Sequence, residues 1–485
     1  MTVRPLSMSG SPFYSRFFAF RSDFFALVQK SHRSIRKYIF FVYWNFYKFI
    51  IHTLMRKLFL ALALFATAST ASAQDWPKFL GPTGDSKSTQ TNLLREWPAA
   101  GPEVVWTTDL GIGYGGPVVQ AGKVYLLDRN HETEEEIMRS FDLLTGKELW
   151  SYKYAAAGKV AYPGSRSVPT VDGKYVYSVG HSGHFYCFDT TTGKPVWNKN
   201  IWTEYGGTRL PVWAISQCPL VYGDLVIVSS LAPEAGLLAY NKVSGELVWK
   251  TENLGPESYT SPTIVKVDGE DHLSIVISST NRFMHREAPV VKGRVIGLNP
   301  KTGEELWRYS NWECMISCAP LTEAGDNKFL IVGGYERGST LIQVVKENGK
   351  YVAKELFVQN EFGDQTKPAL FIDGHFYAQY GTNNRRDGLC CMDINGNVLW
   401  KTKRAPNFDK GSMIYADGLL LATDGANALY LVEPSPEGYK QLAKADLLKS
   451  DIATEGQGNW APMALADGML LIRNQNKMMC VKVTK

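Results

Sequence analysis

Several signatures of known chemistry are missing from this sequence of 485 residues. It contains no C-x-x-C-H segment for covalent haem, and no G-x-S-x-G, H-E-x-x-H, Walker or dinucleotide-binding pattern. These absences argue against a built-in haem, an elbow-type serine hydrolase, a zincin and a phosphate-loop nucleotide-binding protein. Histidine is also sparse: His181-x-x-His184 flanks a hairpin glycine, and no third ligand is spaced with it. This pair therefore favours a solvated turn over a zinc site.

The body of the chain also lacks an excess of positive charge. The formal net charge of +5 arises in the first 73 residues, which carry 10 of the 52 basic residues and one of the 47 acidic ones. The remainder has 42 basic and 46 acidic residues, a net charge of −4. A mildly acidic protein gives no reason to expect nucleic acid as a partner. The composition is 45% hydrophobic and 20% charged, which excludes disordered, collagen-like and coiled-coil proteins.

A targeting segment is expected over residues 55–73. Met55-Arg56-Lys57 is basic, Leu58–Ala66 is apolar, and small residues end at Ala71-Ser72-Ala73. This three-part pattern predicts a signal peptide cleaved after Ala73, so that the mature chain begins at Gln74 and is periplasmic or secreted. The apolar run is shorter than the roughly 20 residues that a membrane span needs.

Residues 1–54 precede this signal and fit no targeting pattern. We interpret them as a spurious upstream extension that arises from a wrongly chosen start codon. The alternative is a membrane anchor, for which Tyr38–Met55 is the candidate, although Asn45, Lys48 and His52 interrupt it. No cysteine follows Ala73 directly, so a lipid attachment point is missing there. We expect no stable membrane span in the mature chain.

Internal repetition is the strongest signal after residue 73. Segments with Asp or Asn, then Thr-Gly or Ser-Gly, end in a tryptophan, as in Asp142 to Trp150 and Asn241 to Trp249. Upstream of each lies a strand beginning at proline and a glycine turn, as in Pro117–Tyr125. Degraded repeat ends fall near Phe357 and Leu442. The tryptophans that end strands in this pattern are Trp106, Trp150, Trp197, Trp249, Trp307 and Trp400.

Each unit has four short alternating segments within a period of roughly 40–50 residues, which is typical of a propeller blade. Counting repeat ends gives eight blades over residues 74–485. The last unit, Trp460–Val483, has three strands, while Trp106 has no blade upstream of it. We therefore predict an all-β, eight-bladed β-propeller, closed by an N-terminal strand that joins the C-terminal blade. Closure of this kind removes exposed sheet edges, and we expect a monomer.

The A-x-D-x-x-T-G-x-x-x-W pattern resembles the tryptophan-docking repeat of pyrroloquinoline quinone (PQQ) propellers. The resemblance covers about residues 75–485 and extends to Asp75-Trp76-Pro77, Gly81-Pro82, Pro211-Val212-Trp213 and Glu437-Gly438-Tyr439. The chain is similar to the exported PQQ-binding-like β-propeller repeat proteins. Two better-understood groups share this propeller, the quinoprotein alcohol dehydrogenases and the non-catalytic outer membrane assembly factor BamB. The resemblance implies PQQ and Ca²⁺ as possible cofactors.

Seven cysteines follow the expected cleavage site. Cys187, Cys391 and Cys480 occupy one position of the repeat, where other units have a small residue, so we expect them in the core. The adjacent pair Cys390-Cys391 invites comparison with the disulfide of quinoprotein alcohol dehydrogenases. Neighbouring residues of a strand point to opposite faces, which opposes such a bridge here. Cys314 and Cys318 are too far apart along a strand to pair with each other.

The candidate site lies at the propeller mouth, where the segments joining successive blades gather. A quinone with three carboxylates needs cations, a flat aromatic ring and calcium ligands. Asp364 is the candidate catalytic base and Glu313 the candidate calcium ligand. Polar and aromatic loops surround any propeller mouth, so a water-filled channel without ligand is the alternative. The candidate cofactor-binding residues are Arg166, Trp213, Gln217, Trp312, Lys367 and Trp460.

Two functions remain open from the sequence. We favour an exported binding or scaffold propeller with a small-molecule or protein partner at its mouth. The alternative is a PQQ-dependent dehydrogenase that oxidises an alcohol or sugar hydroxyl. The blades account for nearly all of the mature chain, whereas quinoprotein alcohol dehydrogenases usually carry long insertions that build the active site. Because function resides in the site rather than in the fold, the repeat alone does not decide whether the protein is an enzyme.

Overall fold

The computed structural model describes residue 44 and residues 75–485, except residues 159–160, 163, 283–285, 382–385, 451 and 453–457. The chain divides into two units, Met1–Ser72 and Ala73–Lys485. The extension and the signal peptide expected over residues 1–73 lie outside the described residues, apart from Trp44. No helix within the described part of the chain is long and apolar enough to cross a membrane.

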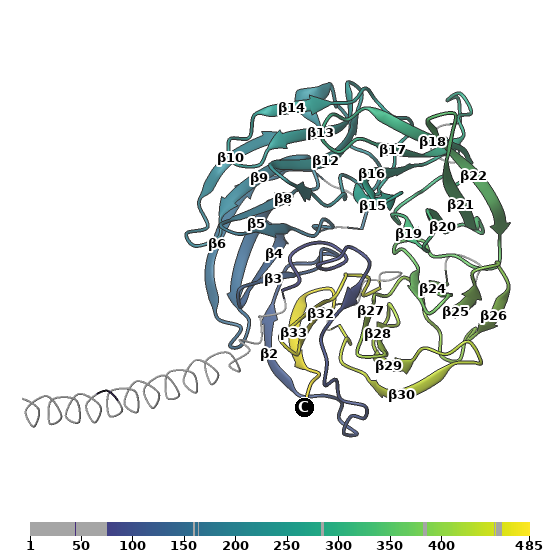
Figure 1. The fold of residues 1–485 in the computed structure, drawn as a ribbon. Coiled ribbons are helices and arrows are strands. Elements are labelled where there is room, and N and C mark those ends of the chain that lie inside the picture. The colour runs from purple at the N-terminus through teal and green to yellow at the C-terminus, as the bar shows by residue number, and fades with distance from the viewer. Residues whose placement is uncertain are drawn as a thin grey trace, which may run out of the picture. The chain divides into compact units, whose positions relative to one another are not determined.

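Residues 75–485 form eight sheets arranged as blades around a common axis (Figure 1). The predicted all-β, eight-bladed propeller is therefore confirmed. In each blade the first strand lies near the axis and the last at the rim. Blade 1 consists of β3 (Val118–Gln120), β4 (Lys123–Asn130), β5 (Glu135–Asp142) and β6 (Glu148–Ala155). Blade 2 consists of β7 (Thr170–Asp172), β8 (Tyr175–Val179), β9 (His184–Asp189) and β10 (Pro195–Asn200), followed by a short 3₁₀ helix, Thr203–Tyr205.

The next four blades follow the same order. Blade 3 consists of β11 (Leu220–Tyr222), β12 (Leu225–Ala232), β13 (Ala235–Asn241) and β14 (Leu247–Lys250). Blade 4 consists of β15 (Thr263–Val267), β16 (Glu270–Ile277), β17 (Gly293–Leu298) and β18 (Glu305–Trp312). Blade 5 consists of β19 (Thr322–Glu323), β20 (Lys328–Gly333), β21 (Gly338–Glu347) and β22 (Lys350–Gln359). Blade 6 consists of β23 (Leu370–Ile372), β24 (His375–Tyr380), β25 (Gly388–Asp393) and β26 (Val398–Lys401).

The two ends of this unit meet in the last blade. Blade 7 consists of β27 (Met413–Ala416), β28 (Leu419–Thr423), β29 (Leu429–Glu433) and β30 (Lys440–Ala445). Blade 8 consists of β31 (Ala464–Ala466), β32 (Met469–Arg473), β33 (Lys477–Lys482) and, at its outer edge, β2 (Val104–Asp109). In the antiparallel pairing of β2 with β33, Trp106 lies opposite Cys480. The ring thus includes a blade built from segments more than 350 residues apart in sequence.

Where the motif is intact, the repeat tryptophan packs on the turn of the following blade, which explains the spacing of the motif. Asp142 accepts a hydrogen bond from the Thr145 amide at 2.9 Å, and Gly146 takes the left-handed conformation, with φ of 69°. A Cβ atom on Gly146 would lie 2.6 Å from the ring of Trp106, so a side chain there would displace it. The indole of Trp106 donates to the Leu143 carbonyl at 2.8 Å. Trp150 and Trp197 make the corresponding contacts one and two blades further on.

The degraded repeats change this contact. Blade 5 lacks the Thr-Gly turn, and Trp307 of blade 4 donates instead to His272 Nδ1 of its own blade at 2.9 Å. Its ring stacks on Phe329 with centroids 6.2 Å apart. Phe357 takes the tryptophan position in blade 5 and lies against Gly396. Neighbouring blades therefore still pack on each other through aromatic rings where the sequence motif is degraded.

The repeat position that holds a small residue lies opposite the tryptophan that packs on the next blade. Cys187 faces Trp197, Cys391 faces Trp400, and all three cysteines of this position are 0% exposed. Gly297 holds the same position, and a Cβ atom there would lie 2.1 Å from its tryptophan ring. The expected core location of these cysteines is confirmed. All seven cysteines are free.

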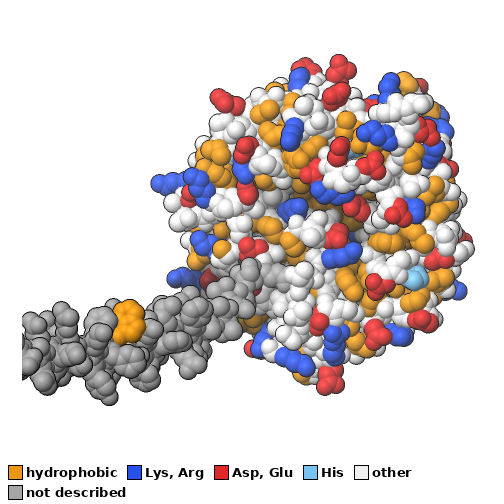
Figure 2. Space-filling view, viewed as in Figure 1, with side chains coloured by type: hydrophobic (Ala, Val, Ile, Leu, Met, Phe, Trp, Pro, Cys, Tyr) orange, Lys and Arg blue, Asp and Glu red, His pale blue; other side chains and the backbone are white. Residues whose placement is uncertain are grey.

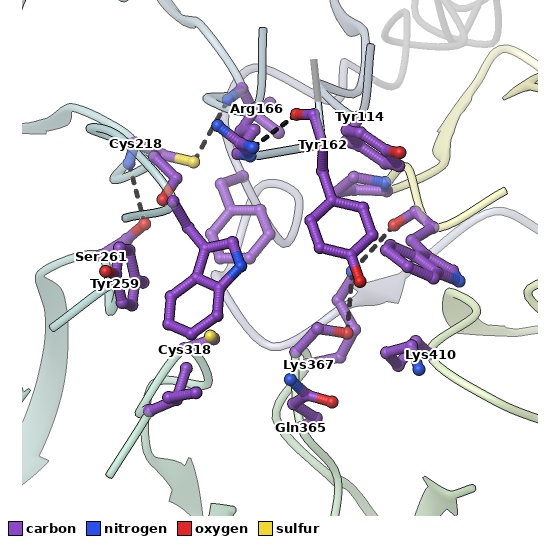
Figure 3. A pocket seen from close by; sticks show the side chains of 18 of the residues that line it. Tyr114, Tyr162, Arg166, Cys218, Tyr259, Ser261, Cys318, Gln365, Lys367 and Lys410 are labelled. Carbon is purple, nitrogen blue, oxygen red and sulfur yellow. Dashed lines mark hydrogen bonds between the residues drawn. The ribbon is translucent and has the colours of Figure 1, made fainter. Parts of the chain in front are cut away.

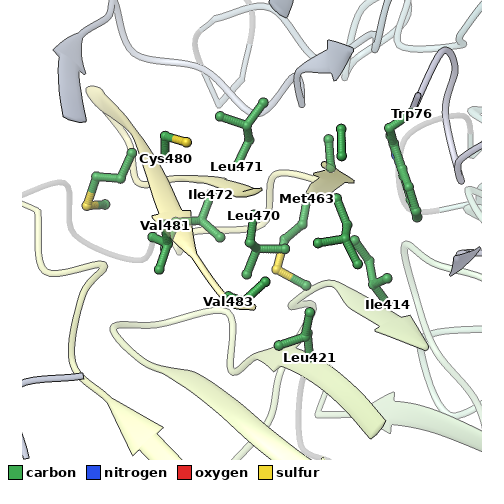
Figure 4. Close-up of a cluster of buried hydrophobic side chains, with 14 of the residues drawn as sticks. Trp76, Ile414, Leu421, Met463, Leu470, Leu471, Ile472, Cys480, Val481 and Val483 are labelled. Carbon is green, nitrogen blue, oxygen red and sulfur yellow. The ribbon is translucent and has the colours of Figure 1, made fainter. Parts of the chain in front are cut away.

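The segment before β2 crosses one end of the axis. Trp76 exchanges backbone hydrogen bonds with Val119 of blade 1, and β1 (Lys87–Ser88) pairs in parallel with β27 of blade 7. Trp76 belongs to a buried hydrophobic cluster that includes Ile414 and Leu470 and joins blades 1, 7 and 8 (Figure 4). This segment places Phe79 at the base of the axial channel.

Candidate functional site

A cavity of about 260 Å³ lies on the propeller axis, where the segments joining successive blades converge (Figure 3). All eight of these segments contribute to its wall, and Phe79 borders it as well. Among the residues that line it are seven aromatic and three basic side chains. The aromatic residues are Phe79, Tyr114, Tyr162, Trp213, Tyr259, Tyr335 and Trp460, and the basic residues are Arg166, Lys367 and Lys410.

Two groups of rings form opposite parts of the wall. Trp460 stacks on Tyr114 with centroids 5.4 Å apart and an interplanar angle of 24°, and Tyr162 lies 5.6 Å from the same indole. Trp213 meets Tyr259 edge to face at 5.5 Å. Flat rings with negative faces suit a planar ligand or a cation. Lys410 already uses one such face, since its Nζ lies 4.8 Å from the Trp460 ring.

Arg166 presents an unsatisfied donor to this cavity. Its Nη2 donates to the carbonyls of Ala161 and Tyr162, while its Nη1 is buried and has no hydrogen-bond partner among the described residues. Burial lowers the pKa of this guanidinium to about 10, so it stays cationic at neutral pH. A buried cationic donor without an acceptor is costly unless a ligand supplies one.

Lys367 belongs to the same wall. Its Nζ donates to the Trp460 carbonyl at 3.0 Å and to Thr366 Oγ1 at 3.4 Å. Burial lowers the pKa of this amine. Lys410, in contrast, lies 3.0 Å from a carboxylate oxygen of Asp409. Lys410 is therefore paired with a carboxylate, whereas the amine of Lys367 bonds to a neutral carbonyl and a hydroxyl group.

Asp364 lies behind this wall rather than in it. Its carboxylate is fully buried and accepts the amides of Thr366 at 2.9 Å, Lys367 at 3.1 Å and Gln379 at 3.2 Å. Burial raises the pKa of this carboxyl to about 6 despite these bonds. Asp364 holds the backbone that carries Lys367, and it does not line the cavity.

The remaining sequence candidates divide into two groups. Arg166, Trp213, Lys367 and Trp460 border the cavity together. Gln217 is buried beside it, with its amide donating to the Ser258 carbonyl at 2.7 Å.

Two further candidates lie elsewhere. Trp312 is 0% exposed and packs in the hydrophobic cluster between blades 4 and 5. Glu313 has a side chain that is 61% exposed and pairs with Lys292 at 3.2 Å. Neither lines the cavity.

Four of the cavity residues that the sequence prediction missed share one register with Arg166, which it named. In five blades the residue three positions before the initial proline lines the cavity, whereas the prediction used the two positions nearest the proline. Aligning the segments on the prolines and reading one residue further back would have found them. The four missed residues in this register are Tyr114, Ser216, Tyr259 and Gln365.

A buried ionic cluster ties two of the cavity loops to the blades. Glu136 is 0% exposed and accepts hydrogen bonds from the His181 amide at 2.8 Å and from His181 Nδ1 at 3.0 Å. Burial alone would raise the pKa of Glu136, but these hydrogen bonds outweigh it and lower the pKa. Arg129 donates to the Ala156 carbonyl at 2.8 Å, and the His181 carbonyl accepts the Ile215 amide at 2.9 Å. The loops that carry Arg166 and Trp213 are thereby fixed to blades 1 and 2.

A second cavity, of about 650 Å³, meets the first at Phe79, Cys218 and Ser261. Inner strands of blades 3 to 6 line it, together with the segment that crosses the axis. Its charged residues are of both signs: Lys78, Asp85, Lys87, Lys266, Asp271 and Glu323. Basic and acidic side chains are likewise interspersed over the face of the molecule shown in Figure 2.

The described residues do not suit a calcium ion as well as they suit a planar anion. None of those that line the first cavity is Asp or Glu. No group of three His, Cys, Asp or Glu side chains in the described ranges is arranged to hold a metal ion. Calcium sites in proteins take six to eight oxygen ligands, commonly with several carboxylates. The orphaned Nη1 of Arg166 and the ring walls, in contrast, fit the carboxylates and the flat rings of a quinone such as PQQ.

Comparison with known proteins gives local sequence matches and a shared fold. The family model described as outer membrane protein assembly factor BamB matches residues 133–313. A quinoprotein ethanol dehydrogenase of Pseudomonas aeruginosa is 31% identical over 170 residues, 33% of this chain and 24% of that protein. A quinohemoprotein alcohol dehydrogenase of Comamonas testosteroni is 24% identical over 198 residues, 38% of this chain and 27% of that protein. The chain thus spans about a quarter of the length of these curated relatives.

The crystal structure of the Comamonas testosteroni quinohemoprotein alcohol dehydrogenase superposes with a TM-score of 0.58. The alignment covers 87% of this chain and 82% of that one at 12% sequence identity, so the likeness concerns the fold alone. This chain is thus an eight-bladed β-propeller that is similar, over part of its sequence, to PQQ-like propeller proteins.

Proposed function

We propose that this protein is a binding propeller whose axial cavity holds a small, flat anion. The observation that carries the proposal is the pairing of a buried, unsatisfied Arg166 donor with ring-lined walls and no carboxylate among the described lining residues. An anionic group would accept the free Nη1 donor, and a planar body would lie against the aromatic walls. A concave, mostly aromatic cavity with a few convergent polar groups is the usual form of a small-molecule site.

The alternative is the PQQ-dependent dehydrogenase suggested by the names of the matched relatives. When bound, PQQ with Ca²⁺ would supply hydride-accepting chemistry. Arg166 and Lys367 suit the anionic quinone, but the described lining offers no carboxylate for the metal or for a base that removes the hydroxyl proton. We therefore propose binding without catalysis. A protein partner at the same mouth remains a prediction from the sequence.

The test uses PQQ with the purified protein, in Ca²⁺ and in a chelator. Binding by calorimetry that is stoichiometric and independent of Ca²⁺, without alcohol-dependent dye reduction, is the expected result. Calcium-dependent uptake with dye reduction would establish the dehydrogenase instead. Failure of PQQ and of simple planar aromatic carboxylates to bind would refute the binding proposal.

We also propose that the protein is exported, with Gln74 as its first residue. The support is the three-part signal that starts at Met55. Deletion of residues 1–54 should leave export intact, and mass spectrometry of the exported product should give Gln74 as the N-terminus. Residues before Met55 in the exported product would contradict this.

A further inference from the structure

Lys367 is a basic side chain of the axial cavity whose amine bonds to neutral groups. Its two hydrogen-bond partners are the neutral Trp460 carbonyl and Thr366 hydroxyl, and it forms no ion pair within the described part of the chain. Lys410 differs because Asp409 lies 3.0 Å from its Nζ. Arg166 adds a second cation to the same wall. The charge of Asp364 favours the protonated amine of Lys367, but burial outweighs it and lowers the pKa. A lysine desolvated in the wall of a cavity is a setting in which an amine becomes a neutral nucleophile.

The other nucleophiles in the wall are less suited to this role. Burial raises the pKa of the Cys318 thiol to about 12, so it stays protonated at neutral pH. The sulfur of Cys218 accepts the Val168 amide at 3.2 Å, and burial raises the pKa of this thiol as well. Burial has the opposite consequence for an amine, because it favours the neutral, reactive form: it lowers the pKa of Lys367.

We propose that Lys367 forms a reversible imine with an anionic aldehyde or ketone held in the axial cavity. This inference rests on the proposed function, because the anionic group at Arg166 and the aromatic walls would orient the carbonyl toward the amine. The ligand class is therefore narrower than planar anions in general: it is a flat, anionic carbonyl compound.

The step is balanced without a redox partner. The lone pair of neutral Nζ attacks the carbonyl carbon and forms a C–N bond, while the π electrons move to oxygen, which takes up a proton. The nitrogen gives up its two protons in turn, the hydroxyl group takes up a second proton and leaves as water, and a C=N bond remains. Water adds to this bond in the reverse direction and releases the ligand unchanged.

The experiment traps the imine directly. The purified protein is incubated with 4-carboxybenzaldehyde and cyanoborohydride, which reduces an imine to a stable secondary amine, and the adduct is mapped by peptide mass spectrometry. We expect one adduct per chain, at Lys367. It should disappear in Lys367→Arg, which keeps the charge but not the primary amine. It should persist in Lys301→Arg, which alters an exposed lysine outside the cavity.

A calorimetric titration with 4-methylbenzoate, which has the ring and carboxylate but no aldehyde, runs in parallel. If 4-methylbenzoate binds and no adduct forms at Lys367, the imine proposal fails and the binding proposal stands. If neither compound engages the cavity, both fail. Equal labelling of exposed lysines also contradicts the imine proposal. Mapping on the wild-type protein gives the answer even if Lys367→Arg does not fold, and a thermal midpoint of that variant detects such a failure.

Discussion

Contacts at the rim of this propeller follow the sequence repeat, whereas the residues at its axis differ from blade to blade. At the rim, the same contact recurs: Trp106, Trp150 and Trp197 each pack on the glycine turn of the following blade and donate to a backbone carbonyl there. At the axis, the eight joining segments place different residues side by side, from Tyr114 to Lys410. The repeated contacts at the rim join neighbouring blades. At the axis the residues do not repeat, and they form a cavity with a particular set of aromatic and basic side chains. A residue's distance from the axis therefore indicates whether its loss should affect stability or binding.

The largest expected effect is at the rim. Trp197→Ala removes a ring that is 9% exposed and should lower the free energy of unfolding by about 3–5 kcal/mol, as other large-to-small core changes do. Chemical denaturation measures the loss, and Trp249→Ala, which removes a ring that is 8% exposed, should behave alike. Below the unfolding transition, the affinity of the variant for a planar aromatic carboxylate should stay at the wild-type value. Stability equal to wild type in both variants would show that the rings are dispensable.

A smaller effect, on binding alone, is expected at the axis. Trp460→Leu keeps an apolar side chain but removes the face that stacks on Tyr114 and meets Lys410. The affinity for a planar aromatic carboxylate should fall about two- to tenfold, since an aromatic pair contributes roughly 0.5–1.5 kcal/mol beyond burial. The thermal midpoint should change little, because the indole is only part of the cavity wall. A large loss of stability with unchanged affinity would show that Trp460 serves stability rather than binding, and would contradict the distinction between rim and axis.

The smallest expected effect depends on pH and concerns the cluster that joins the two regions. Because hydrogen bonding lowers the pKa of Glu136 in the folded state, its stabilising contribution is complete above its unfolded pKa of about 4.5. That contribution decreases as pH falls through the folded pKa. The stability difference between wild type and Glu136→Gln should therefore be greatest at neutral pH and shrink below pH 4.5, by about 1.4 kcal/mol for each unit of pKa lowering. Denaturant unfolding at pH 7 and at acid pH measures this, and a difference that grows at acid pH would contradict it.

The sequence predicted the rim far better than the axis. The Asp, Thr, Gly and tryptophan positions follow from local turn chemistry that recurs along the chain, so the count of eight blades and the small residue position at Cys187 could be derived. The cavity depends on which non-repeating residues converge, and convergence is a property of the closed ring. Arg166, Trp213, Lys367 and Trp460 were named from their loops and do line it. Tyr114 and Tyr259 were missed because their register becomes visible only when the segments are aligned on their prolines.

Asp364 and Trp312 show why residue type alone is a poor guide to a site. Both lie near the expected segments, but the buried carboxylate of Asp364 accepts three backbone amides, and Trp312 fills the space between blades 4 and 5. Backbone groups that leave a strand near the axis need hydrogen-bond partners, and side chains between blades fill the core. A polar or aromatic residue in a joining segment can serve either need, and only the three-dimensional arrangement separates these roles from ligand binding.

The most direct test of the central claim is a calorimetric titration of the wild-type protein and of Arg166→Ala with Lys367→Ala, using terephthalate as a planar dianion. Lys266→Ala, which alters the second cavity, is the matched control. We predict saturable binding to wild type and to the control, and a loss of at least tenfold in the double variant, since hydrogen bonds to charged groups contribute roughly 1.5–3 kcal/mol each. Unchanged affinity in the double variant, or an equal loss in Lys266→Ala, would place the binding site away from the axial cavity and contradict the account.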